Sequence, residues 1–258
     1  MRHYFSEFSY GYAVTEEFMR RMGPFAFAPR FLNLRQEARE GYDVLLQTQA
    51  TQLYLQFKLS DKMVWNSALE AQSGEMHVPY YRMYVRPSRL SKQHESLLNL
   101  ERRGRRVEYV VPAFYTSEEF DDYYLSHGVI DHSRRIPPSH IGTLIGDGTH
   151  YVAFQDDDPN KPIHIHSKDS RKFRVPSWEK LMSELKANAR TAKPLRDSLA
   201  DTERDMIEIL DRSHEESPKW KGVRSVQLGD SPIERVTSLA QVFFNCTLIL
   251  VTDSSAVA

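Results

Sequence analysis

One strand pattern constrains the fold of this chain more than any other feature. From Leu53 to Leu59, apolar side chains alternate with Tyr54, Gln56 and Lys58. Because successive side chains of a strand point to opposite faces, Gln56 and Lys58 are expected on one face and the leucines and phenylalanine on the other. The apolar face needs a packed core, so the pattern predicts a sheet that holds two polar groups on its opposite face.

A second strand-like run precedes this one and contains a carboxylate. Tyr42 to Leu46 is separated from the first strand pattern by the polar stretch 47–52, which predicts an antiparallel hairpin. If the hairpin brings Asp43 to the same end as Gln56 and Lys58, a carboxylate, an amide oxygen and an ammonium group meet in one pocket. A carboxylate and further oxygens suit Mg²⁺, and a lysine can orient a metal-bound water or stabilise charge on a phosphate.

Helical periodicity flanks the hairpin. Apolar residues recur at helical spacing over Ser9 to Met22, and Pro87 to Arg103 predicts a second helix that ends at Gly104. Val107 to Phe114 then has the valine and tyrosine content of a strand. The first half of the chain therefore predicts the order α-β-β-α-β.

The second half predicts an α/β extension of helices and short strands. Ser231 followed by a proline and by Glu234 is the sequence signature of a capped helix start. The other expected elements are a hairpin of Tyr151 to Phe154 with Ile163 to His166, helices after Ser177 and Pro194, and a buried strand over Thr247 to Val251. We expect a core over residues 1–125 and a C-terminal extension over 126–258 packed on it.

The order of elements and the residues Asp43, Gln56 and Lys58 resemble the PD-(D/E)xK, restriction-endonuclease-like superfamily, in its Mrr-like branch where glutamine replaces the middle acid. The resemblance covers roughly Ser9 to Phe114, and no Pro-Asp pair precedes the motif. It implies a restriction-endonuclease-like core with a mixed sheet. It also implies a metal-dependent endonuclease that uses Mg²⁺ or Mn²⁺, acts on DNA more than RNA, and serves in restriction or anti-phage defence.

The resemblance also implies a further carboxylate from the preceding helix. The candidates are Glu16, Glu17, Glu37 and Glu40, and we favour Glu17 because Val14, Phe18 and Met22 would pack that helix against the sheet. The site expected from the resemblance is thus Asp43, Gln56, Lys58 and Glu17, with the metal bound by all of these except the lysine. The alternative is that Asp43 caps a turn while Gln56 and Lys58 lie on the wetted face of an edge strand.

Basic residues gather between Arg82 and Arg106, on or beside the second expected helix. Such a cluster favours contacts with nucleic-acid phosphates, although a solvated helix face is an equally good interpretation. The expected nucleic-acid-binding residues are Arg86, Arg89, Lys92, Arg102 and Arg103.

Composition limits the wider interpretation. The chain has 34 lysines and arginines against 35 acidic residues, so any attraction to nucleic acid must come from local clusters. The single cysteine, Cys246, cannot form an internal disulfide and is expected to be buried. With no long apolar stretch and no secretory signal, we expect a cytoplasmic protein without a membrane contact. A homo-oligomer or a partner subunit is a further expectation.

Two other interpretations stay in view. His164 and His166 share one strand face, but without a recognisable third ligand an ordinary exposed strand is the better interpretation. The expected function also has an alternative, which is a catalytically silent nuclease-like module that binds nucleic acid or another protein.

Overall fold

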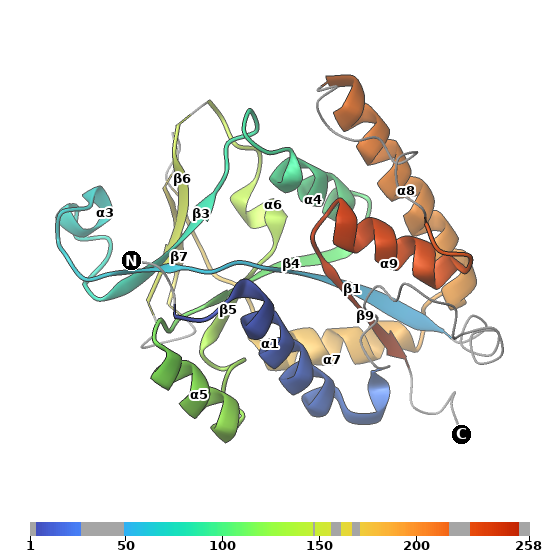
Figure 1. Ribbon diagram of the computed structural model, residues 1–258, viewed down its shortest axis with the longest axis horizontal. Helices are drawn as coiled ribbons and strands as arrows, with labels where there is room; N and C mark the ends of the chain where they lie inside the picture. Colours follow the sequence, from blue (N-terminus) through green and yellow to red (C-terminus); the bar gives the residue numbers. More distant parts are fainter. Residues whose placement is uncertain are drawn as a thin grey trace. The chain divides into compact units, whose positions relative to one another are not determined.

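The computed structural model describes residues 4–26, 49–146, 148–155, 161–166, 171–216 and 228–252 (Figure 1). Both helices and strands run through this part of the chain, which confirms the expected mixed α/β class. Internal contacts divide the chain into two compact units. The first is Met1–Arg21, Phe57–His94 and Glu108–Leu181, and the second is Met22–Gln56, Glu95–Val107 and Met182–Ala258. The division into a nuclease-like core over 1–125 and an extension over 126–258 stays a prediction.

The first unit is built around a five-stranded antiparallel sheet with the order β2-β3-β6-β7-β8. The strands of this sheet are β2 (Asp61–Met63), β3 (Tyr80–Val85), β6 (His150–Phe154), β7 (Ile163–His166) and β8 (Arg171–Phe173). The other elements are α1 (Glu7–Met22), α3 (Leu69–Gln72), α5 (Ser117–Ser126), β5 (Ser133–Ile136) and α6 (Pro138–Ile141). β4 (Arg106–Pro112) enters this unit at Glu108, and α7 (Trp178–Ala189) leaves it after Leu181.

The two faces of the five-stranded sheet differ in chemistry. Residues directly opposite one another on neighbouring strands point to the same face. On one face Met83 opposes Val152, which opposes Ile165, and all three are buried. On the other face Arg82 opposes Ala153, which opposes His164. The sheet thus has an apolar face and a face that presents polar and ionisable side chains.

The residues of helix α1 explain where it begins and ends and which of its side chains are buried. Glu7 lies in the first turn and Arg20 and Arg21 lie in the last, which suits the helix dipole. Gly23 follows with a φ of +58°, a left-handed conformation that commonly ends a helix. Val14, Phe18 and Met22 are buried, as expected from their helical spacing.

The second unit contains β1 (Ala50–Phe57), most of α4 (Gln93–Arg102), α8 (Leu195–Glu216), α9 (Pro232–Val242) and β9 (Thr247–Thr252), with a short 3-10 turn over Gly23–Phe25. β1 and β9 pair antiparallel, with Ala50 opposite Thr252 and Leu55 opposite Thr247. The four-stranded sheet has the order β5-β4-β1-β9.

Several sequence predictions are confirmed. β6 and β7 form the expected antiparallel hairpin, and β9 is a buried strand. Ser231 caps α9 with a complete capping box, in which its side chain accepts the Glu234 N–H and the Glu234 carboxylate accepts the Ser231 N–H. Cys246 is buried and free.

Two boundaries were predicted wrongly. β1 begins at Ala50, inside the stretch expected to be a polar loop, because pairing with β9 satisfies its backbone groups. Its antiparallel partner β9 is the last strand of the described residues, while Tyr42 to Leu46, the expected hairpin partner, lies outside them. The helix expected from Pro87 begins only at Gln93, because the N–H groups of Leu90 and Ser91 both donate to the Pro87 carbonyl and form a turn.

The sequence patterns also missed seven described elements of the first unit, namely β2, α3, β3, α5, β5, α6 and β8. A restriction-endonuclease-like core stays a prediction, since the described residues show the mixed α/β class and no finer relationship. No helix of the described residues combines the length and apolar character required to cross a bilayer.

Candidate functional site

Lys58 directly follows β1 and lines a recess of the first unit. Its backbone N–H donates to the Val110 carbonyl of β4 at 3.0 Å, which fixes the chain at this point. The recess has a volume of about 210 Å³. Its lining residues are Glu7, Lys58, Leu59, Tyr84, Val85, Arg86, Ser91, Gln93, His94 and Tyr109. Two residues predicted for different roles, Lys58 for catalysis and Arg86 for nucleic-acid binding, therefore border one hollow.

The wall of this recess includes an ordered histidine. His94 is 5% exposed, and its Nε2 lies 2.7 Å from the Gly142 carbonyl oxygen. A carbonyl can only accept, so Nε2 carries a hydrogen and donates it, and Nδ1 lies in hydrogen-bond contact with the Tyr109 hydroxyl at 3.0 Å. Both ring nitrogens are thus engaged, which gives the recess a fixed wall.

The remaining residues of the expected catalytic motif are placed only in part. Gln56 lies in β1, is 0% exposed, and makes contacts of its own. Asp43 lies outside the described residues, so its distance from Lys58 stays a prediction. Among the alternative acids, Glu37 and Glu40 also lie outside the described residues, and Glu16 is a half-exposed partner of Arg20 at 3.8 Å.

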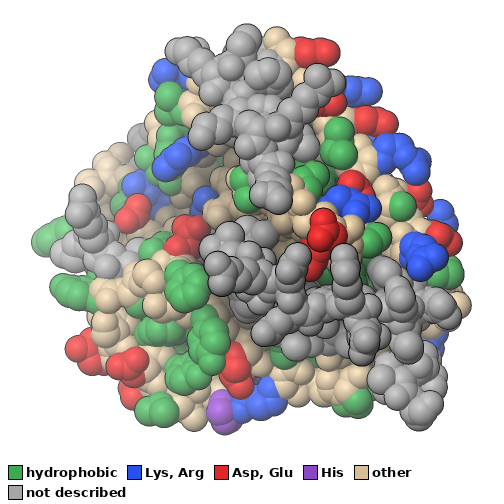
Figure 2. Space-filling view, turned by 45° about the vertical axis from the view of Figure 1, so that its right-hand side comes forward, with side chains coloured by type: hydrophobic (Ala, Val, Ile, Leu, Met, Phe, Trp, Pro, Cys, Tyr) green, Lys and Arg blue, Asp and Glu red, His purple; other side chains and the backbone are tan. Residues whose placement is uncertain are grey.

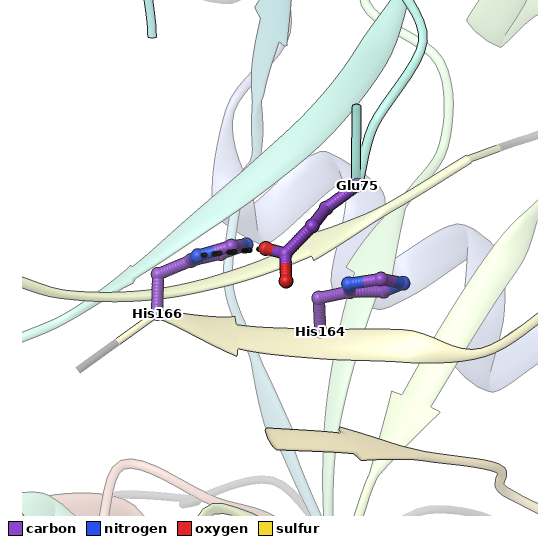
Figure 3. Close-up of side chains that lie close together, drawn as sticks. All are labelled: Glu75, His164 and His166. Carbon is purple, nitrogen blue, oxygen red and sulfur yellow. Dashed lines mark ion pairs between the residues drawn. The ribbon is translucent and has the colours of Figure 1, made fainter. Parts of the chain in front are cut away.

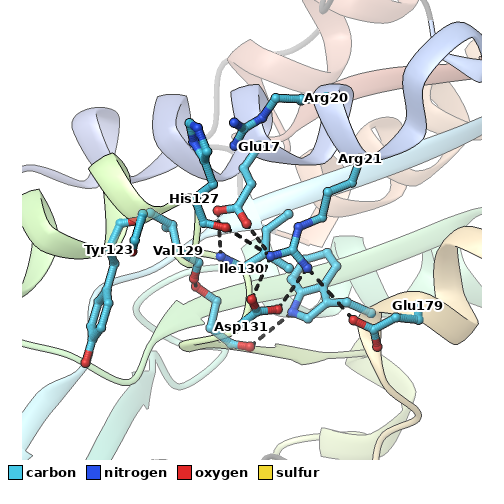
Figure 4. Close-up of polar contacts among 12 residues, drawn as sticks. Glu17, Arg20, Arg21, Tyr123, His127, Val129, Ile130, Asp131 and Glu179 are labelled. Carbon is cyan, nitrogen blue, oxygen red and sulfur yellow. Dashed lines mark hydrogen bonds and ion pairs between the residues drawn. The ribbon is translucent and has the colours of Figure 1, made fainter.

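Glu17 is buried in an ion cluster of the first unit (Figure 4). One carboxylate oxygen accepts from Arg21, and the other accepts the Ile130 N–H at 3.0 Å. Arg21 also donates to both oxygens of Asp131, at 2.8 and 2.7 Å. These carboxylates raise the pKa of Arg21, with the Asp131 hydrogen bonds as the largest cause. A metal at Glu17 would have to displace one of these donors, so the contacts favour a structural role, and metal binding by Glu17 stays a prediction.

The five expected nucleic-acid-binding residues fall into two groups. Arg86, Arg89 and Lys92 belong to the segment before α4 in the first unit. Arg102 is exposed at the end of α4 in the second unit. Arg103 is held by Asp205 and Glu208, both at 2.8 Å, and these acids raise its pKa. Arg103 is therefore already neutralised, unlike the exposed Arg86.

Charges of both signs are interspersed on the face of the molecule shown in Figure 2. The described residues of that face form no broad field of one sign, which agrees with the near-zero net charge. Any electrostatic attraction to a polyanion is therefore local.

A second polar cluster lies on the polar face of the five-stranded sheet. Glu75 follows α3 and reaches His164 and His166 of β7 (Figure 3). One ligand atom from each residue lies within 4.8 Å of the others, so the three could hold a metal ion. The expected exposed position of this strand was wrong, because His164 is only 7% exposed. Glu75 is a third candidate ligand beside the two histidines. Glu75 is far from the two histidines in the sequence, so the spacing of residues along the chain could not identify it as their neighbour.

Comparisons with known protein families, curated proteins and solved structures give no match for this chain. The resemblance to the PD-(D/E)xK superfamily therefore stays an inference from the residues of the motif.

Proposed function

We propose that this chain is a metal-dependent endonuclease that hydrolyses nucleic-acid phosphodiester bonds, with DNA preferred over RNA and a role in restriction or anti-phage defence. The observation that carries the proposal is that Lys58 and Arg86 line the same recess. Two cations around one hollow suit an anionic phosphate.

The size and charge of the recess fit this substrate. Its volume of about 210 Å³ is far above the roughly 10–15 Å³ that a single water occupies, so a phosphate with bound waters can enter. Among the described residues, no acidic side chain forms an ion pair with Lys58 or Arg86. Glu7 is the acidic residue of the lining and limits how much negative charge the recess accepts.

Within this proposal each residue has a separate task. Asp43 would bind Mg²⁺ or Mn²⁺, and the ion would supply an activated water and offset charge on the phosphate. Lys58 orients that water or stabilises the same charge, and Arg86 holds a neighbouring phosphate. Arg89 and Lys92 extend the contact along the segment before α4. Gln56 would supply an amide oxygen to the ion. Because the Gln56 side chain is fully buried, the ion would have to lie inside the fold to contact it.

The test is cleavage of DNA and of RNA by the purified chain with Mg²⁺ or Mn²⁺. Asp43→Ala is expected to abolish cleavage, and Lys58→Ala is expected to lower kcat at least about 100-fold. Lys180→Ala is the matched control, because Lys180 is an exposed lysine of α7 in the same unit. Cleavage by Lys58→Ala at the rate of the control variant would contradict the proposal.

Arg86→Ala separates binding from chemistry. It is expected to raise the Kd for DNA and to reduce the slope of log K against log salt by about one, while bound DNA is still cut. A loss of cleavage with unchanged Kd and unchanged salt slope would contradict the assignment of Arg86 to a phosphate.

A second candidate function is a nuclease-like module that binds nucleic acid or a partner subunit without cutting. The full burial of Gln56 and the engagement of both Glu17 oxygens favour it, because they leave few secure ligands for a catalytic ion. DNA binding without Mg²⁺-dependent cleavage, with no calorimetric signal for Mg²⁺, would decide for this function. Unimpaired cleavage would exclude it.

A further inference from the structure

The cluster of Glu75, His164 and His166 brings together two segments that are far apart in the sequence. Glu75 lies between α3 and β3, and the two histidines lie on β7 with Ile165 between them. Met76, next to Glu75, packs with Tyr80 and Ala153 on the polar face of the five-stranded sheet. The segment after α3 is therefore held on the sheet by a small apolar contact, and the three ionisable residues lie beside it.

The spacing of the cluster suits a bound cation better than direct hydrogen bonds. His166 Nδ1 and the Glu75 carboxylate are 3.8 Å apart, which is too far for a hydrogen bond. Ligand atoms bound at about 2.0–2.2 Å in a tetrahedral site lie roughly 3.4 Å from one another. The present separations of up to 4.8 Å need only a small closing movement. Glu75 can supply it, because its side chain is 32% exposed.

The histidines also have ring nitrogens that call for a ligand. His164 Nδ1 and His166 Nε2 are buried and have no hydrogen-bond partner among the described residues. Buried polar atoms in native proteins are nearly always paired, so such atoms beside a carboxylate need an explanation. Figure 3 shows the Glu75 carboxylate between the two rings. A metal ion between them would bind one nitrogen of each ring together with the carboxylate.

The one basic side chain directly opposite His164 on the neighbouring strand β8 is Lys172. Lys172 is exposed, so its ammonium group can stay in solvent and away from a bound cation.

We propose that Glu75, His164 and His166 bind one divalent transition-metal ion of the Zn²⁺ type, separate from the expected Mg²⁺ ion at Asp43. Two imidazoles and one carboxylate match three-protein-ligand sites that keep a fourth position for water. Mg²⁺ prefers an all-oxygen shell and is disfavoured here. The ion links the segment after α3 to β7.

Calorimetric titration of the metal-free full chain with zinc sulfate tests the proposal. The wild-type chain and Asp43→Ala are both expected to bind one Zn²⁺, which separates this site from the expected nuclease site. His166→Asn and Glu75→Gln are each expected to raise the Kd at least about tenfold. The matched controls are His127→Asn and Glu118→Gln, which alter exposed residues of the same unit. Asparagine tolerates the left-handed conformation of residue 127.

Two further measurements test metal binding even if a variant is less stable than the wild type. Zn²⁺ is expected to raise the Tm of the wild type and the controls, and to raise the Tm of Glu75→Gln by less at the same Zn²⁺ concentration. Co²⁺ in place of Zn²⁺ is expected to give the visible absorption of a four- or five-coordinate site in the wild type and to lose it in His166→Asn. Absence of Zn²⁺ binding by the wild type, or equal Kd values for Glu75→Gln and Glu118→Gln, would overturn the proposal.

Discussion

Replacing Glu17 by glutamine distinguishes the structural role that its contacts favour from the metal-binding role that the sequence predicts. Glu17 is 2% exposed, and its two oxygens accept from Arg21 and from the Ile130 N–H. Glutamine keeps one acceptor oxygen and places an amide N–H₂ against the other donor. The variant therefore loses one charge-assisted hydrogen bond and leaves one buried donor unsatisfied.

The size of the effect follows from these contacts. A hydrogen bond to a charged group contributes about 1.5–3 kcal/mol, and an unsatisfied buried donor costs about 1–3 kcal/mol. Arg21 keeps both hydrogen bonds to Asp131 and is 26% exposed, so part of the loss is recovered. We expect Glu17→Gln to lower the free energy of unfolding by about 2–4 kcal/mol, which for a chain of this length lowers the Tm by roughly 4–16 °C.

Urea unfolding at neutral pH, followed by circular dichroism, measures this difference. Glu16→Gln is the matched control, because Glu16 is the neighbouring acid, is more exposed, and meets Arg20 only at 3.8 Å. The control is expected to change the free energy of unfolding by less than about 0.5 kcal/mol. The structural role would be refuted if Glu17→Gln unfolded like the control while its Mg²⁺-dependent cleavage was lost.

Three further predictions concern stability. Glu108→Ala removes the carboxylate that contacts the buried Arg135 at 2.8 Å, so the free energy of unfolding in urea is expected to fall by about 3–5 kcal/mol. The added change Arg135→Met is expected to restore part of this loss. A loss below about 1 kcal/mol would contradict the prediction. Ser231→Ala removes the N-cap of α9 and is expected to cost about 1 kcal/mol, and unchanged stability would show that the cap is dispensable. Burial lowers the folded pKa of His164 below its unfolded value of 6.5, so the unfolded chain takes up the proton first as the pH falls. The stability contributed by the neutral ring is complete above pH 6.5 and declines as the pH falls from 6.5 to the folded pKa. His164→Gln is expected to decline less over this range, and an identical decline in both proteins would contradict the assignment.

Local patterns determined several elements from the sequence alone. Helix α1 follows from the spacing of Val14, Phe18 and Met22, and α9 follows from Ser231 and Glu234, which cap it. The β6–β7 hairpin and the buried strand β9 were predicted for the same reason. Periodicity and capping involve residues that are near neighbours in the chain, so these features need no knowledge of the tertiary fold.

Partners across the fold were decided only by the tertiary structure. The pattern of β1 predicted a strand but not that β9 would pair with it. Spacing on β7 placed His164 and His166 together, but only folding brought Glu75 beside them. Glu17 was singled out as an acid near the core, while its partners Arg21 and Ile130 became visible only in three dimensions. A side chain's orientation follows from its local backbone, whereas what it meets depends on which distant segment packs there, and that is set by the burial of the whole core.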